Sequence, residues 1–114
     1  MLLPDGSVLV AGGITYGDAL DDDGELYHPA TETWRSTGKL VNKCIGPSLV
    51  LLRDGKVLLA GGEGTRFVTL ASAALYDPTT RRWSASGDLI TGREAHTATL
   101  LPDGKVLVVG GSEF

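Results

Sequence analysis

The chain has 114 residues, with ten basic and fourteen acidic side chains and a net charge of −4. This balance leaves no basic footprint for a nucleic-acid backbone, and no apolar run approaches the ~18 residues that cross a bilayer. Glycine supplies 16 of the 114 residues, a share roughly twice the average glycine content of ~7%. Because the glycines follow no three-residue period, they indicate many tight turns. The composition predicts a soluble globular segment of one domain or less.

The single cysteine, Cys44, excludes an internal disulfide framework and a multi-cysteine zinc site. It does not fix the redox compartment, because secreted proteins can also lack disulfides. The first residues contain no basic and apolar regions of a signal peptide. The localisation of the protein therefore stays open.

A repeat of 49 residues runs through the chain. The segment LLPDGSVLVAGG at residues 2–13 recurs as LLRDGKVLLAGG at 51–62 and as LLPDGKVLVVGG at 100–111. A tyrosine and a tryptophan separated by six residues follow the first two copies at the same offset. No gap is needed in either alignment. The repeat divides the chain into units 1–47, 48–95 and 96–114, the last of them incomplete.

Each unit is expected to begin with a β-hairpin. The first strand, at residues 48–52 or 96–101, ends at an Asp-Gly pair, which predicts a hairpin turn with positive φ at both residues. The second strand, at 56–60 or 105–109, is a short continuous apolar run and is expected to be buried on both faces. The Gly-Gly pair that follows leaves no side chains where neighbouring backbone must pass closely.

Two further strands are expected in each complete unit. The third covers residues 24–28 or 71–77 and ends before Pro29 or Pro78, because proline cannot continue the pairing. The fourth begins near the repeated tryptophan and ends at the glycine four residues later. No apolar period of 3.6 residues extends beyond one turn, so helices are not expected.

Four antiparallel strands repeated every ~50 residues are typical of a β-propeller blade. The double glycine after an apolar strand, followed by the spaced tyrosine and tryptophan, resembles the kelch repeat. The sequence of residues 100–111 is similar to that of bacterial kelch proteins and of the central propeller of galactose-oxidase-like proteins. This resemblance implies an all-β fold of about two and a half kelch-type blades. The repeated aromatic residues are interpreted as packing between blades. The residues that carry the repeat are Gly12, Gly13, Tyr27, Trp34, Gly61, Gly62, Tyr76, Trp83, Gly110 and Gly111.

The connections of such a unit alternate between two ends of the molecule. Tight turns are expected at one end, and at the other end long loops at residues 14–23, 37–47, 63–70 and 86–95. The tight turns are nearly preserved between units, whereas the long loops differ almost everywhere. Because function tends to lie on variable loops held by a rigid scaffold, the long-loop end is the candidate binding surface for a protein or glycan. Its candidate residues are Asp18, Asp21, Asp22, Asp23, Arg66, Arg93 and His96.

Several of these residues allow a second interpretation. The acidic cluster before Gly24 departs from a calcium loop at Ala19 and is interpreted as a solvated loop. Residues 62–65 faintly resemble a dinucleotide-binding loop, but the third glycine is missing, which favours repeat-turn chemistry. Arg93 and His96 are interpreted as pinning a loop, the alternative being contact with an anionic or sugar ligand.

Galactose-oxidase-like enzymes hold copper with tyrosines and histidines and cross-link one tyrosine to a cysteine. In this sequence Tyr16, His28, Cys44 and His96 do not form such a ligand motif. The resemblance therefore implies the fold and no catalytic residue. The leading hypothesis is a non-enzymatic binding module without a cofactor. The alternative is part of a carbohydrate-active enzyme whose catalytic residues lie outside these 114 residues.

Assembly is the last expectation. Repeat units bury their faces against their neighbours, so the outer faces of the first and last units are expected to be apolar and uncovered. Further blades of a longer chain, or other copies of this one, are expected to cover them.

Overall fold

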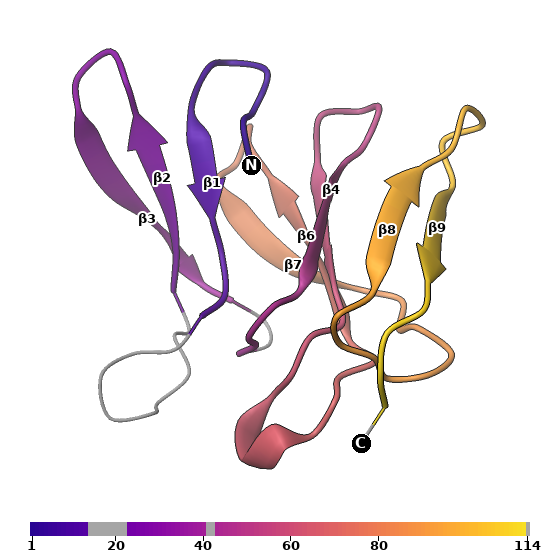
Figure 1. The fold of residues 1–114 in the computed structure, drawn as a ribbon. Coiled ribbons are helices and arrows are strands. Elements are labelled where there is room, and N and C mark those ends of the chain that lie inside the picture. The colour runs from indigo at the N-terminus through magenta and orange to yellow at the C-terminus, as the bar shows by residue number, and fades with distance from the viewer. Residues whose placement is uncertain (14–22, 41–42, 114) are drawn as a thin grey trace.

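The computed structural model describes residues 1–13, 23–40 and 43–113, which form an all-β fold of three antiparallel sheets (Figure 1). The described part also contains one short 3-10 helix, and no helix in it is long and apolar enough to cross a membrane. The elements in chain order are β1 (Val8–Val10), β2 (Asp23–His28), β3 (Thr33–Lys39), β4 (Ser48–Leu51), β5 (Val57–Ala60), η1 (Thr65–Phe67), β6 (Ala73–Asp77), β7 (Arg82–Ser86), β8 (Thr97–Leu100) and β9 (Val106–Val109).

Each sheet corresponds to one unit of the 49-residue repeat. The second unit contains all four expected strands, in the order β4-β5-β6-β7. The first sheet has the order β1-β2-β3, and its inner strand is reduced to a single bridge between Leu2 and Val8. The third sheet consists of β8 and β9. Strand β6 begins at Ala73 instead of residue 71, because the carbonyl groups of Ala71 and Ser72 accept hydrogen bonds from Leu89 and Gly61.

The Asp-Gly turns differ in one respect from the sequence expectation. Only the glycine has positive φ, +89° at Gly6, whereas Asp5 does not. Gly6 donates its amide hydrogen to the carbonyl oxygen of Leu3, and the Leu3 amide bonds to the Ser7 carbonyl. This is a type I turn followed by a left-handed glycine, a longer hairpin loop than the two-residue turn expected. The other two Asp-Gly pairs repeat this pattern at Gly55 and Gly104.

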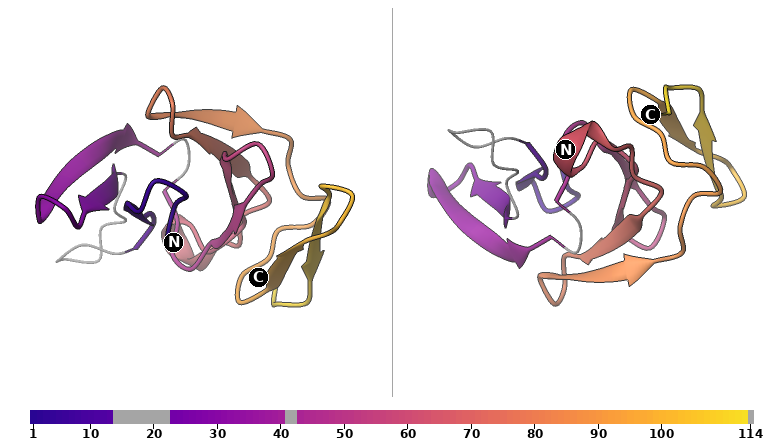
Figure 2. Two further views of the ribbon diagram at one scale, coloured as in Figure 1. Left: turned by 90° about the horizontal axis from the view of Figure 1, so that it is seen from above. Right: turned by 90° about the horizontal axis from the view of Figure 1, so that it is seen from below.

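The three sheets lie face to face in chain order. Strand β4, the first strand of the second unit, contacts β8, the first strand of the third (Figures 1 and 2). Strand β3, the fourth strand of the first unit, contacts β7, the fourth strand of the second. In the described part of the chain the sheets do not close into a ring (Figure 2). All tight turns lie at one end of the sheets, and residues 61–72 and 87–95 lie at the other (Figure 1).

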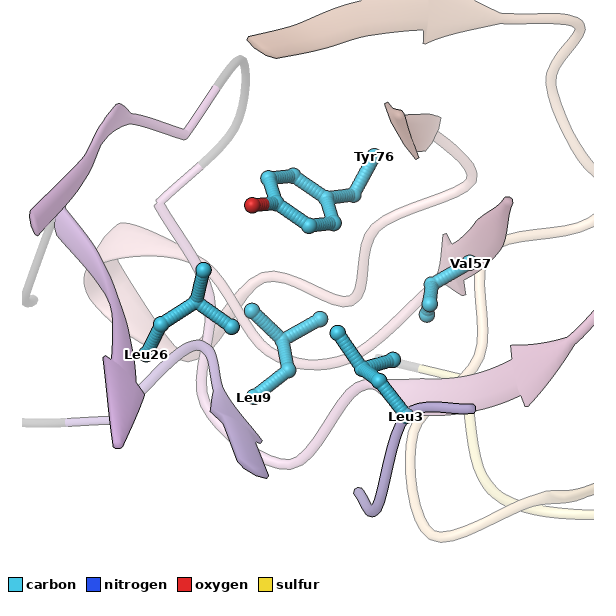
Figure 3. Packing of buried hydrophobic residues seen from close by; sticks show 5 residues of the cluster. All are labelled: Leu3, Leu9, Leu26, Val57 and Tyr76. Carbon is cyan, nitrogen blue, oxygen red and sulfur yellow. The ribbon is translucent and has the colours of Figure 1, made fainter. Parts of the chain in front are cut away.

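The core lies between the first and second sheets. Leu3, Leu9 and Leu26 of the first unit pack against Val57 and Tyr76 of the second (Figure 3). A second cluster nearer the long-loop end contains Leu40, Cys44 and Leu59. Both clusters join side chains that are distant in sequence, so packing between units holds the fold together.

Trp83 links the two clusters. It packs against both of them and contacts the Tyr76 ring in a tilted arrangement, with ring centroids 5.1 Å apart. Its indole Nε1 donates a hydrogen bond to Thr37 Oγ1 of the first sheet, at 2.9 Å. Trp34 makes the equivalent tilted contact with Tyr27 at 4.9 Å, yet it is 55% exposed. The two tryptophans differ because the described part of the chain has no sheet against the Trp34 face.

The central strands show the same dependence on neighbours. In β5, Val57 and Leu59 on one face are buried almost completely, whereas on the other face Ala60 is buried and Leu58 is only half-buried. In β9, Leu107 and Val109, the repeat equivalents of Leu58 and Ala60, are 49% and 53% exposed, because no described residue covers that face. The apolar sequence pattern of the two strands is the same, and the neighbouring sheet makes the difference.

Candidate functional site

At the long-loop end, the glycine pairs bond to the segment that leads from each unit into the next. The Gly13 amide donates to the Cys44 carbonyl oxygen at 2.8 Å, and the Gly62 amide donates to the Arg93 carbonyl oxygen at 2.9 Å. The two contacts are related by the 49-residue offset. A Cβ atom placed on Gly61 would lie 2.7 Å from the Arg93 carbonyl oxygen. The first glycine of the pair therefore lacks a side chain because the segment leading to the next unit passes too closely.

A second repeated contact fixes the base of each long loop. Ile45 and Glu63 exchange two backbone hydrogen bonds of 2.8 and 2.9 Å, and Glu94 and Ser112 exchange two of 3.0 Å. Glu63 also forms a bridge with Thr69, on the return arm of the loop. Three backbone segments thus form a small ladder below the loop. The loop tip is attached to a rigid base.

Residues 61–72 form the long loop of the second unit. The Gly64 amide donates to the Val68 carbonyl oxygen at 2.8 Å and closes the tip around η1. Arg66 and Phe67 have φ of 59° and 60°, a left-handed conformation that is uncommon outside glycine. Phe67 is 76% exposed, and Val68 is also exposed. The tip presents an aromatic and an aliphatic side chain to solvent.

The neighbouring loop, residues 87–95, lies along this one. The Arg93 amide donates to the Leu70 carbonyl oxygen at 3.2 Å, and the Leu89 amide donates to the Ala71 carbonyl oxygen at 2.7 Å. Ile90, between these two contacts, is fully exposed. The two loops are thus hydrogen-bonded to each other, and each carries exposed apolar side chains.

Arg93 and His96 both make contacts within the junction. The Arg93 Nη1 donates to the Gly110 carbonyl oxygen at 2.9 Å. The His96 Nε2 lies 3.0 Å from Ser48 Oγ, while its Nδ1 is buried without a hydrogen-bond partner in the described part of the chain. A Cβ atom on Gly61 would lie 2.7 Å from His96 Cε1. These contacts indicate that Arg93 and His96 have a packing role.

The other predicted residues are dispersed. Arg66 lies at the tip of the 61–72 loop, whereas Asp23 begins β2 of the first sheet, opposite Lys39. Asp18, Asp21 and Asp22 lie outside the described residues. The structure thus brings together the loops that carry Arg66 and Arg93 and places Asp23 on a different sheet.

The residues considered for copper do not converge either. Cys44 is fully buried, and desolvation raises the pKa of its thiol to about 11. His28 ends β2 at the tight-turn end, and His96 lies in the junction. Tyr16 lies outside the described residues. Among residues 1–13, 23–40 and 43–113, no three His, Cys, Asp or Glu side chains are grouped so that they could hold a metal ion.

The exposed apolar side chains of the long-loop end were not singled out from the sequence. Phe67 and Ile90 occupy loop positions where the first unit has Asp18 and Val41. A large apolar residue that has no apolar counterpart in the other unit, as at Phe67, is the signal that could have found this site.

Comparison with protein-family models gives no match for this chain, and comparison with curated proteins gives none either.

Proposed function

We propose that the three sheets are consecutive blades of a kelch-type β-propeller whose long-loop end binds a protein partner. Two features support the blade arrangement. The first strands β4 and β8 are in contact, as are the fourth strands β3 and β7. The Ile45–Glu63 backbone pair between the first and second units recurs as Glu94–Ser112 between the second and third. Units that pack by the same contacts at a fixed offset are typical of repeat folds.

The exposure of Phe67 carries the binding proposal. Its side chain is 76% exposed on a loop whose base is fixed by the Glu63 ladder. Phe67 and Val68 on one loop and Ile90 on the adjacent loop are exposed large apolar side chains, and such side chains can mark interaction surfaces. Aromatic and arginine residues are enriched in the centres of protein interfaces, and Arg66 lies beside Phe67. The role is binding without catalysis.

A protein partner fits this surface better than a glycan. The exposed groups are one phenyl ring, two aliphatic side chains and a guanidinium, which suit an apolar contact with a charged margin. The 61–72 loop presents them in a left-handed conformation held by the Gly64–Val68 hydrogen bond. A loop ordered in advance lowers the entropic cost of binding.

The test is selection of binders from a random displayed peptide library on the wild-type chain, with a glycan array in parallel. Enriched peptides are expected to lose binding to Phe67→Ser and to Ile90→Ser. Leu107→Ser is the matched control, because Leu107 is an exposed apolar residue away from these loops. Peptides that bind Phe67→Ser and Ile90→Ser as well as wild type would contradict the proposal. Binding of glycans alone would contradict the choice of a protein partner.

A further inference from the structure

Strand β9 has one edge without a partner in the described part of the chain. It pairs with β8 only, whereas the equivalent strand β5 lies between β4 and β6 (Figure 1). The Leu101 amide donates to the Lys105 carbonyl oxygen across the tight turn. Because the direction of hydrogen bonding alternates along an antiparallel strand, the backbone groups of Val106 and Val108 point to the open edge. Such an edge is a template for a further strand.

The second unit shows which strand fills the equivalent edge. There β6, with the sequence Ala-Ala-Leu-Tyr-Asp, pairs antiparallel with β5, and its Tyr76 lies opposite Val57. Val106 is the repeat equivalent of Val57. A strand that pairs with β9 in the same register therefore carries a tyrosine opposite Val106.

Tyr76 of β6 is also a member of the apolar cluster between the first and second sheets. Its ring projects toward Leu9 and Leu26 of the first sheet (Figure 3). The other two members of this cluster are Leu3 and Val57. All five side chains are between 0% and 5% exposed. The strand that fills the edge of β5 thus also supplies the ring that covers the facing sheet.

The junction between the second and third sheets has the same cluster without the tyrosine. The four aliphatic members have repeat equivalents, which are Leu52, Leu58, Leu75 and Val106. Leu75 is next to Tyr76 along β6 and therefore points to the opposite side, toward the third sheet. Each of the four equivalents is only partly buried. No described residue takes the place of the tyrosine, so an apolar site for one aromatic ring lies beside the open strand edge.

We propose that β9 binds an extended segment of a partner protein that carries the pattern of β6, two small residues followed by leucine and tyrosine. The segment adds to the edge of the third sheet as an antiparallel strand, and its tyrosine ring packs on Leu58 and Leu75. Strands β2 and β6 of a second copy carry Leu-Tyr but are paired on both edges, which favours a segment outside the described residues. The proposal uses the repeated contacts and is independent of the role of the long loops.

The test is fluorescence polarisation of a dye-labelled peptide with the sequence of residues 72–77, Ser-Ala-Ala-Leu-Tyr-Asp, titrated with the chain. Saturable binding is expected. A matched peptide with serine in place of the tyrosine is expected to bind at least about tenfold more weakly, because the burial of one aromatic ring is lost. No binding, or equal binding of the two peptides, would overturn the proposal.

Two N-methylated peptides test the strand pairing. In the second sheet the Ser72 carbonyl oxygen accepts from the Gly61 amide, so by alternation Ala74 directs its amide to β5 and Leu75 directs its amide away from it. N-methylation at the alanine equivalent to Ala74 removes a hydrogen bond to β9 and is expected to weaken binding at least about fivefold. N-methylation at the leucine equivalent to Leu75 is the matched control. Equal affinities of the two methylated peptides would contradict the strand pairing.

A variant of the chain locates the site. Val108→Pro removes an amide that faces the open edge, where a strand tolerates proline, and is expected to weaken binding at least about fivefold. Phe67→Ser is expected to leave binding unchanged, because Phe67 lies at the tip of a long loop, so this proposal and the long-loop proposal can fail separately. Wild-type affinity in Val108→Pro would overturn the assignment. Self-association of the chain that Val108→Pro abolishes, with no binding of the peptide, would assign the edge to a second copy and overturn it as well.

Discussion

Gly61 and Gly110 occupy equivalent positions of the repeat with different surroundings. Both have positive φ, +67° and +75°, so alanine costs roughly 1–2 kcal/mol at either position. At Gly61 the new Cβ atom would also meet the Arg93 carbonyl oxygen at 2.7 Å, whereas at Gly110 it would meet no atom within 4 Å.

We predict that Gly61→Ala lowers the free energy of unfolding by about 1–3 kcal/mol more than Gly110→Ala, because of this overlap. Urea unfolding midpoints of the two variants measure the difference. The shared φ penalty cancels in the comparison. Equal losses would show that the junction does not pass as closely over Gly61 as described.

Trp83 and Trp34 form a second matched pair. Trp83→Ala removes packing against both core clusters and the hydrogen bond to Thr37, so a loss of about 3 kcal/mol is expected. Trp34 is 55% exposed, and Trp34→Ala is expected to cost less than about 1 kcal/mol. Denaturant unfolding of both variants is the measurement. A loss below about 1 kcal/mol for Trp83→Ala would mean that this side chain does not hold the two sheets together.

Cys44 makes stability depend on alkaline pH. Burial raises the pKa of its thiol from 9.0 to about 11 in the folded chain. Between these values the unfolded chain loses the proton while the folded chain keeps it, so the free energy of unfolding falls as pH rises from 9 to about 11. The raised pKa of Tyr76 also lowers the free energy of unfolding at alkaline pH, and it does so in wild type and in Cys44→Ala alike. Unfolding curves across this range should fall more steeply for wild type than for Cys44→Ala, and parallel pH profiles would contradict the burial of the thiol.

At the scale of elements, the 61–72 loop tip is independent of the sheets. Phe67 is exposed and belongs to neither core cluster. Phe67→Ser is therefore expected to change the free energy of unfolding by no more than about 0.5 kcal/mol, as surface substitutions do. Thermal or urea unfolding of this variant is the check. A loss of several kcal/mol would show that Phe67 is part of the core and is not available to a partner.

The strands could be predicted from the sequence because their signals are local and occur more than once. Apolar runs bounded by Asp-Gly and Gly-Gly gave the positions of β5 and β9, and the prolines gave the ends of β2 and β6. The turn geometry could not be predicted from the Asp-Gly pair alone. Pro4 favours a type I turn, and the Leu3–Ser7 hydrogen bonding extends the loop by one residue.

Burial and the candidate sites depend on contacts between units, which a repeat pattern does not encode. Trp34 and Trp83 have equivalent sequence surroundings, but within residues 1–13, 23–40 and 43–113 only Trp83 has a further sheet beside it. The exposure of Phe67 follows from the left-handed conformation of Arg66 and Phe67, which no turn motif in the sequence predicts. A cleft of about 410 Å³ at the tight-turn end, between the first and second sheets, exists because residues from three separate turns meet, and such a meeting is visible only in three dimensions.

At the scale of the whole molecule, the sheets cover one another in order and leave two outer faces open in the described part of the chain. One open face carries Val10 and Trp34, and the other carries Leu107 and Val109. In the interior, Leu9 and Leu26 of one sheet pack against Val57 and Tyr76 of the next. In this interior contact the face of one sheet is complementary to the opposite face of the next sheet. The open face of the third sheet in one copy therefore fits the open face of the first sheet in another copy.

Sedimentation of the purified 114-residue chain at micromolar concentration tests this account most directly. Exposed apolar faces and the open edge of the third sheet favour association, so we predict species heavier than the 11.9 kDa chain. The association should weaken in Leu107→Lys, which places a charge on one of the open faces. A monodisperse 11.9 kDa species that unfolds cooperatively would contradict the claim that each sheet needs a neighbour on both faces.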